Sequence, residues 1–190
     1  MFAARYSGSL HCMRVYLAGP DVFLPAPLER GAALKRMCAA HGLAGVFPLD
    51  PLPDGDPADW DALPDAFRIA RRNETHIAGC DALIANLTPF RGPSADAGTV
   101  FELGFMRALG RPVFGWSNTI MLFAARTHAF LGDDDPSGML VEDFGLADNL
   151  MIEGAIQASG GALFTAAIAE ADIWQDLSAF SRCVVALARA

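Results

Sequence analysis

The sequence predicts an α/β fold built on a parallel β-sheet. Short apolar runs bounded by turn residues alternate along the chain with segments whose apolar residues recur at helical spacing. The runs are apolar throughout, which is typical of strands covered on both faces. Alternating strands and helices favour parallel βαβ units with right-handed crossovers. Together these observations indicate a flavodoxin-like, three-layer α/β fold with a five-stranded parallel sheet, and we expect the strand order 2-1-3-4-5.

The predicted strands share one feature, because each is a short apolar run flanked by turn residues. They cover residues 14–18, 45–49, 80–87, 113–115 and 162–164. The predicted helices share apolar residues spaced three or four positions apart. They cover residues 26–41, 63–77, 99–109, 120–125 and 154–159, with one or two more between 166 and 188.

Turn residues delimit the elements in the first half of the chain. Gly19 and Pro20 end the first strand. Gly42 suits the position that follows the C-terminus of a helix. Pro48 places the second strand at an edge of the sheet, because proline cannot donate a hydrogen bond to a neighbouring strand. Residues 50–64 hold five Asp and four Pro, so they predict an irregular loop.

The second half is organised around residues 79–107, in which an apolar run, a loop of small and polar residues and a helix follow one another. We expect Thr99 to cap or begin that helix, with Glu102 in its first turn. Residues 117–137 are ambiguous apart from one helical piece and an acidic turn at 132–136.

Composition limits the class of protein. The chain has 190 residues, of which 53% are hydrophobic, and this predicts a single domain over residues 13–190 after a disordered extension, 1–12. The sequence lacks both a signal-peptide pattern and an apolar stretch approaching the ~20 residues of a membrane span. We therefore expect a cytoplasmic protein without a membrane partner. The net charge of −8 argues against nucleic-acid binding.

The motifs of common cofactor sites are absent from the sequence. No GxGxxG or GxxxxGK[ST] pattern follows the first strand. The four cysteines are scattered without a CxxC spacing, which disfavours a zinc cluster or a disulfide framework. Two histidines, His76 and His128, stand alone. We therefore expect neither a cofactor nor a metal.

Two carboxylates remain as the candidate reactive groups, Asp96 and Glu102. They follow the third strand, and ligands of parallel sheets bind beyond the carboxyl ends of the strands. In the first turn of a helix, Glu102 would stay ionised near the positive end of the helix dipole, which suits a nucleophile. Two carboxyl groups in one pocket can cleave a bond at an anomeric carbon. The structural alternative is that Asp96 caps the helix and Glu102 pairs with Arg107 or Arg111.

Three stretches of the sequence resemble the nucleoside 2-deoxyribosyltransferase family. They are VYLAGPDVF (15–23), CDALIANLTPFRGPSADAGTVFELGFMRAL (80–109) and DNLMI (148–152). The resemblance spans residues 14–164, and its central stretch is long and specific. It implies a flavodoxin-like fold and the transfer of 2-deoxyribose between nucleobases. The implied partners are a deoxynucleoside and a free nucleobase.

The resemblance also implies three catalytic residues. Glu102 would be the nucleophile that attacks C1′, forms a covalent deoxyribosyl-enzyme and returns the sugar with net retention. Asp96 would act near the leaving base and its proton. Tyr16 would hydrogen-bond the nucleophile and hold its rotamer.

Further positions are implied to bind the substrate. We expect Phe23 to pack on the base and Asn73 to supply a polar group. Asn149 would reach the sugar 5′-hydroxyl bound by a neighbouring chain, which implies a homo-oligomer of at least two chains; the alternative for Asn149 is an Asx turn. Asp81 is expected to be partly structural. The full set is Gly19, Pro20, Phe23, Asn73, Asp81, Asn86, Arg91, Gly92, Ser94, Gly98, Asn149 and Met151.

One departure from the family and two rival functions remain. Asn86 stands where many members of the family have aspartate, so one negative charge is missing near the pocket. The first rival is an N-glycosidase that uses water as acceptor and acts on a nucleoside or on a nucleoside 5′-monophosphate. Arg91 and Ser94 could hold that phosphate, although the net charge disfavours it. The second rival is a non-catalytic nucleoside- or nucleotide-sensing module.

Overall fold

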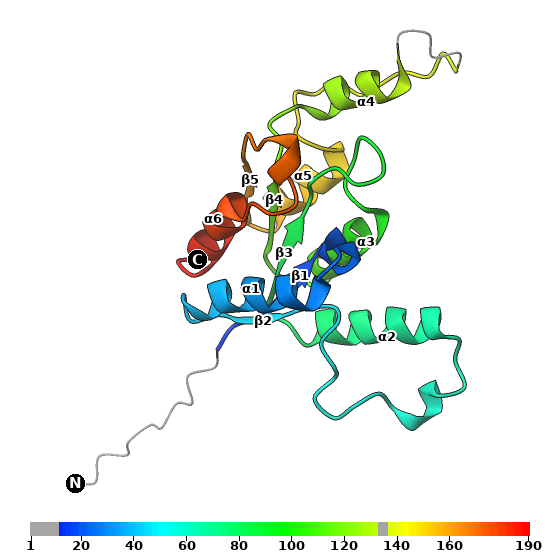
Figure 1. The fold of residues 1–190 in the computed structure, drawn as a ribbon, viewed down its shortest axis with the longest axis vertical. Coiled ribbons are helices and arrows are strands. Elements are labelled where there is room, and N and C mark those ends of the chain that lie inside the picture. Colours follow the sequence, from blue (N-terminus) through cyan, green and yellow to red (C-terminus); the bar gives the residue numbers. More distant parts are fainter. Residues whose placement is uncertain (1–11, 133–136) are drawn as a thin grey trace, which may run out of the picture.

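Five parallel strands form one sheet, which lies between two layers of helices (Figure 1). The computed structural model describes residues 12–132 and 137–190. The strands are β1 (Arg14–Ala18), β2 (Ala44–Val46), β3 (Ala82–Asn86), β4 (Val113–Ser117) and β5 (Leu163–Thr165). Their order is β2-β1-β3-β4-β5, which confirms the predicted topology.

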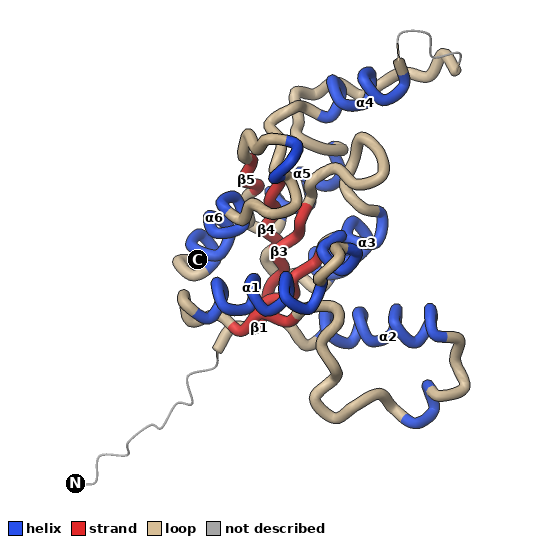
Figure 2. Tube along the Cα trace, in the orientation of Figure 1, coloured by secondary structure: helices blue, strands red, loops and turns tan. Residues whose placement is uncertain are grey.

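Five of the α-helices lie between successive strands along the chain and the sixth follows the last strand; Figure 2 shows helices in blue and strands in red. They are α1 (Pro27–Ala39), α2 (Asp65–Ala78), α3 (Ala97–Ala108), α4 (Phe123–Leu131), α5 (Leu150–Ala158) and α6 (Ser178–Leu187). The region 166–188, predicted to hold one or two helices, contains α6 and a short 3-10 turn at Glu170–Asp172.

Alternate residues of the strands build two separate cores. Val15 and Leu17 of β1 pack in the core formed with α1 and α6. Tyr16 and Ala18 face the opposite core, to which α2, α3 and α5 contribute. This alternation follows from the two-residue period of a strand. The Tyr16 side chain therefore points toward α3.

Two helices begin earlier than the sequence suggested, and in both cases a side chain explains the difference. α3 begins at Ala97 because Asp96, not Thr99, caps it: Asp96 Oδ2 accepts a 2.9 Å hydrogen bond from the Thr99 backbone N–H. The placement of Glu102 in the first turn was therefore wrong, since Glu102 lies in the second turn. α5 begins at Leu150, because Asn149 Oδ1 accepts a 3.0 Å bond from the Met151 N–H.

Two other elements also differ from their predicted bounds. β2 ends at Val46 and not at residue 49, because Asp50 closes a turn in which its own N–H donates to the Phe47 carbonyl. β2 is an edge strand, as predicted. α4 covers Phe123–Leu131, where a helical piece was predicted at 120–125.

Some expectations concern residues outside the described ranges. The described ranges exclude residues 1–11, which are most of the predicted N-terminal extension. They also exclude residues 133–136 of the predicted acidic turn. Among the described residues, no helix combines the length and the apolar character needed to cross a bilayer.

Candidate active site

A cavity of about 310 Å³ opens beyond the carboxyl ends of β1 and β2, next to the start of α3. Its volume is at the lower end of the range typical of small-molecule sites. Four segments line it: the turn after β1, the turn after β2, the middle of α2 and the first two turns of α3 with its cap. The lining residues are Gly19, Val22, Phe23, Pro48, Leu49, Ile69, Asn73, Asp96, Gly98, Thr99 and Glu102.

Glu102 is held in this cavity by two neighbouring side chains. The hydroxyl of Tyr16, which is fully buried, donates a 2.7 Å hydrogen bond to Glu102 Oε1. Asn73 Nδ2 donates to the same oxygen at 3.4 Å. Three elements, β1, α2 and α3, therefore converge on one carboxylate. The Tyr16 contact is the one that the family resemblance implied.

The environment of Glu102 favours its protonated form. The pKa of Glu102 is raised from 4.5 to about 7. Burial is the largest cause and the charge of Asp96 adds to the rise, while the hydrogen bonds from Tyr16 and Asn73 oppose it. The prediction that the helix dipole would keep Glu102 ionised was therefore wrong: the dipole effect fades beyond the first turn, and desolvation dominates. Burial also raises the pKa of Tyr16, so that Tyr16 remains a neutral donor.

The geometry does not support the alternative in which Glu102 pairs with Arg107 or Arg111. Arg111 donates to the backbone carbonyls of Ile77, Ala78 and Cys80. Within the described residues, no ion pair joins Glu102 to Arg107 or Arg111.

Asp96 combines a structural role with a place in the cavity wall. Its Oδ2 accepts hydrogen bonds from the backbone N–H of Thr99 at 2.9 Å and from the Thr99 hydroxyl at 3.1 Å. The predicted alternative, in which Asp96 caps the helix, is therefore confirmed. Asp96 also lines the cavity beside Gly98 and Glu102, so the cap fixes a second carboxyl group close to the first.

One aromatic ring, that of Phe23, lines the cavity, and a second ring stacks on it. Phe23 stacks on Phe90 with centroids 5.4 Å apart and planes inclined by 9°. The guanidinium of Arg91 lies over both rings, 5.0 Å from the Phe23 centroid and 4.6 Å from that of Phe90. Arg91 adopts a left-handed backbone conformation, with φ of 56°. It supports the aromatic pair from outside and does not line the cavity.

A buried cluster of three polar side chains lies behind Gly19, and sequence reasoning missed two of them, Asp21 and Arg30. Asn86 donates a 2.8 Å hydrogen bond to Asp21 Oδ2, and Asp21 lies 3.6 Å from Arg30. A carboxyl group therefore lies next to Asn86 after all, that of Asp21, whose pKa burial raises. The position of Asp21, directly after the first strand, was the available signal.

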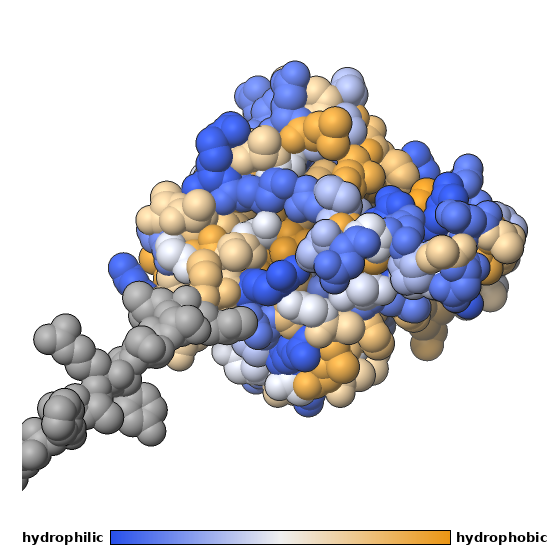
Figure 3. Space-filling view, turned by 90° about the horizontal axis from the view of Figure 1, so that it is seen from below, coloured by the Kyte–Doolittle hydropathy of each residue, from blue (hydrophilic) through white to orange (hydrophobic). Residues whose placement is uncertain are grey.

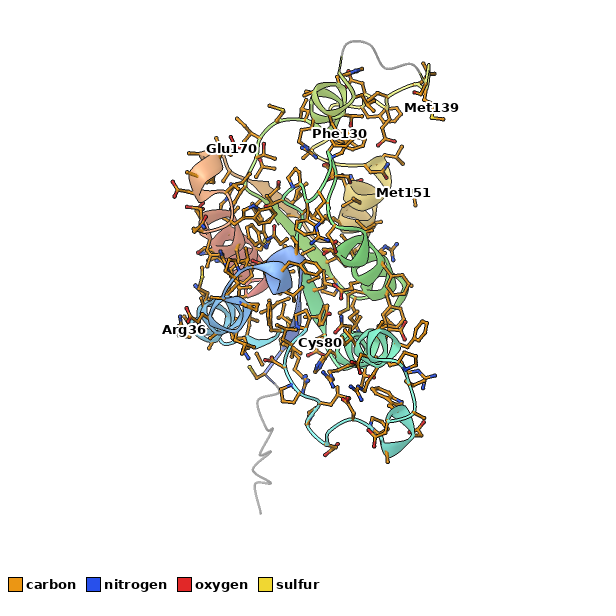
Figure 4. All side chains as sticks on the ribbon, turned by 45° about the vertical axis from the view of Figure 1, so that its right-hand side comes forward. Arg36, Cys80, Phe130, Met139, Met151 and Glu170 are labelled. Carbon is orange, nitrogen blue, oxygen red and sulfur yellow. The ribbon has the colours of Figure 1, made fainter. Side chains whose placement is uncertain are left out.

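Several predicted binding residues lie outside the cavity. Asp81 is at the amino end of β3, where its carboxylate accepts from the Arg14 backbone N–H. The Ser94 hydroxyl donates to Asp148 at 2.5 Å. Asn149 caps α5 and Met151 lies in its first turn, and both line other hollows. Figure 4 shows Met151 on the same flank as Phe130 and Met139. Pro20, Asn86 and Gly92 are likewise absent from the lining. The lining residues that sequence reasoning did not single out are Val22, Pro48, Leu49, Ile69 and Thr99.

Metal coordination has no candidate here, since the described residues contain no group of three or more His, Cys, Asp or Glu side chains able to hold an ion.

Comparison with known proteins relates this chain to enzymes acting on nucleosides. The model of the family described as nucleoside 2-deoxyribosyltransferase matches residues 15–151. A solved 2-deoxyribosyltransferase from Leishmania mexicana is 30% identical, with a TM-score of 0.59; the match covers 74% of this chain and 85% of that one. An uncharacterized protein of Schizosaccharomyces pombe is 32% identical over 169 residues, which are 77% of this chain and 78% of the relative.

Proposed function

The chain belongs to the nucleoside 2-deoxyribosyltransferase family, and we propose that it transfers 2-deoxyribose between nucleobases with Glu102 as the nucleophile. One observation carries the proposal: a buried carboxylate, fixed by the Tyr16 hydroxyl at 2.7 Å, lines a cavity beyond the carboxyl ends of the strands. The second carboxyl group that such a reaction needs, Asp96, lines the same cavity.

In the first step, ionised Glu102 attacks C1′ of the deoxynucleoside. A bond forms between C1′ and a carboxylate oxygen, the C1′–N bond breaks, and its electron pair leaves with the base. A proton from solvent, relayed by Asp96, neutralises the departing base, which leaves as a neutral molecule. Tyr16 and Asn73 both donate to Oε1, so Oε2 is the oxygen that attacks.

In the second step, a nitrogen of the incoming base attacks C1′ from the face that the first base left. The bond to Glu102 breaks, the carboxylate is regenerated, and Asp96 accepts the proton that the incoming base gives up. Two inversions produce net retention at C1′. Phe23, the exposed ring of the stacked pair with Phe90, is the surface on which either base packs.

The substrate is a nucleoside without a 5′-phosphate in this proposal. Ser94, which would be needed to hold a phosphate, already donates to the carboxylate of Asp148. An anion placed there would face that carboxylate at close range and would displace its hydrogen bond. The net charge of −8 also disfavours binding of a phosphate.

We further propose that two copies of the chain complete each other's sites, with Asn149 reaching the substrate of its neighbour. Asn149 uses Oδ1 to cap α5 and one N–H to bond Glu142 at 3.0 Å, which leaves one amide hydrogen for a ligand. Around it the surface is apolar, since Leu140 is 99% exposed and Met151 71% exposed. The face viewed in Figure 3, by contrast, mixes blue polar residues with orange apolar ones.

One experiment tests the reaction. The protein is incubated with deoxyinosine, with and without free adenine, and both hypoxanthine and deoxyadenosine are measured. We expect deoxyadenosine to form and hypoxanthine release to depend on adenine. Equal release of hypoxanthine without an acceptor would assign a hydrolase instead, and tight binding without turnover would assign a sensing module.

A further inference from the structure

A second set of charges lies outside the cavity, at the junction of α4, α5 and the loop that precedes α3. Arg126 and Asp148 form an ion pair at 3.3 Å, and their side chains are only 9% and 2% exposed. In Figure 1 this junction lies where α4 meets the rest of the fold, above α5. Neither residue takes part in the reaction proposed above.

Arg126 joins three loops through its guanidinium. Its Nε donates to the Pro93 carbonyl at 2.7 Å, and its two terminal nitrogens donate to the carbonyls of Met121 and Ala147 and to Asp148. Arg126 and Ala124 are the buried residues of α4. The one charged residue that α4 buries, Arg126, therefore holds the neighbouring loops in place.

The carboxylate of Asp148 accepts four hydrogen bonds. Its Oδ1 accepts from the Ser94 hydroxyl and from the Asn149 N–H, at 2.5 and 2.8 Å. Its Oδ2 accepts from the Ala95 N–H at 3.1 Å as well as from Arg126. Four donors use all the acceptor positions that a carboxylate offers.

The two loops held in this way end in residues of the proposed site. Ala95 directly precedes Asp96, and Asp148 directly precedes Asn149. A buried ion pair is weak support for stability alone, because desolvation offsets much of its attraction. Its geometric effect is larger, since it fixes both loops relative to each other.

We propose that the Arg126–Asp148 pair positions Asp96 and Asn149 for the transfer reaction. Both act as positioning residues, because neither lines the cavity. This inference rests on the proposed function for the meaning of Asp96 and Asn149. The positional coupling itself can be measured without any turnover.

Amide hydrogen exchange provides that measurement in the full chain. The Thr99 N–H bonds to Asp96, and the Met151 N–H bonds to Asn149, so these two amides report where the two side chains lie. In Asp148→Asn and in Arg126→Lys we expect both amides to exchange about tenfold faster or more, while the amides of β1 keep their protection.

Two further variants keep the test decisive. Ser159→Ala removes a partly buried polar contact at the far end of α5, where Ser159 bonds the backbone of Val113, and should leave the Thr99 and Met151 amides unchanged. If Asp148→Asn does not fold, Ser94→Ala removes one bond to Asp148 and should accelerate Thr99 but not Met151. Unchanged exchange at both amides, or equal acceleration in Ser159→Ala, would overturn the proposal.

Kinetics then connect the coupling to the reaction. We expect Asp148→Asn to lower kcat about 100-fold, a loss typical of a misplaced catalytic group. In an Asp96→Asn background the same substitution should no longer lower kcat, although it should still raise KM through Asn149. A full additional loss of kcat would contradict action through Asp96. If the wild-type protein transfers no deoxyribose, the proposed function fails, while the amide result still decides whether the pair couples the two loops.

Discussion

The Tyr16 hydroxyl lies 2.7 Å from Glu102 Oε1, in a contact that joins the sheet to the second turn of α3 across 86 positions of the sequence. Two opposing effects meet in this bond. Burial raises the pKa of Glu102, and the hydrogen bond from Tyr16 limits the rise, because it stabilises the ionised carboxylate. A nucleophile in this position must lose its proton near neutral pH.

The pH dependence of the wild-type enzyme follows from that balance. As the proposed nucleophile, Glu102 would attack only when ionised, and its pKa is raised to about 7. We expect kcat/KM to rise with pH through a single ionisation near pH 7, as measured by initial rates of transfer from pH 5 to 9. Full activity at pH 5 would show that Glu102 is ionised well below neutrality or is not the nucleophile.

Tyr16→Phe removes the donor and leaves the ring. Because a hydrogen bond to a charged group contributes about 1.5–3 kcal/mol, we expect the ionisation seen in kcat/KM to move up by about one to two pH units. The limiting rate should also fall, since the carboxylate loses its fixed orientation. An unshifted profile would mean that the hydroxyl does not stabilise the ionised form of Glu102.

Glu102→Gln should abolish transfer and change the pH dependence of stability. The folded-state pKa of about 7 exceeds the unfolded value of 4.5, so the native state binds the proton more tightly. The stability that this proton provides is present below pH 4.5 and is lost as the pH rises through 7, by at most about 3 kcal/mol. We therefore expect denaturant unfolding to show Glu102→Gln more stable than wild type at pH 8.

A matched comparison isolates this effect. Asp65→Asn also replaces a carboxyl by an amide, but the Asp65 side chain is 84% exposed. Its pH profile of stability should parallel that of wild type between pH 5 and 8. Parallel profiles for Glu102→Gln as well would contradict the burial of the Glu102 charge.

Gly19→Ala tests the close packing behind the cavity. Gly19 has φ of 156°, and a Cβ there would lie 2.7 Å from Asn86 Cβ and 2.8 Å from Asp21 Oδ2. We expect a loss of about 2 kcal/mol or more in the free energy of unfolding, because strain and overpacking add. Gly104→Ala is the control: its Cβ meets nothing within 4 Å, and alanine favours a helix interior. Equal effects of the two substitutions would refute the packing described here.

Sharing of sites between copies can be tested by mixing two inactive variants. In a dimer of Glu102→Gln with Asn149→Ala, one site combines an intact Glu102 with an intact Asn149. If subunits exchange freely, we expect an equal mixture to recover about a quarter of wild-type transfer activity. No recovery, despite exchange of subunits confirmed by native mass spectrometry, would show that each chain forms its site alone.

The sequence was sufficient for the topology and for the residues next to Glu102. The β3–α3 stretch has an unbroken apolar strand followed by a polar loop, so strand, loop and helix were all predictable. Tyr16 and Asn73 followed from the family resemblance, and the structure brings both to Glu102.

What the sequence did not provide depends on contacts between distant segments. The pKa of Glu102 is set by the burial that α2 and β1 create around it, which no local pattern encodes. Asp21 appeared to be a turn residue until Asn86 and Arg30 were seen beside it. Arg126 lies in a region without a clear pattern, because its partners are backbone carbonyls.

The most direct test of the central proposal is to look for the covalent intermediate. The protein is incubated with deoxyinosine without an acceptor base, quenched in acid, digested and examined by peptide mass spectrometry. We expect the peptide that contains Glu102 to gain the mass of one deoxyribosyl group, and the gain to disappear when adenine is added before the quench. Hypoxanthine release with no adduct on any peptide would contradict nucleophilic attack by Glu102.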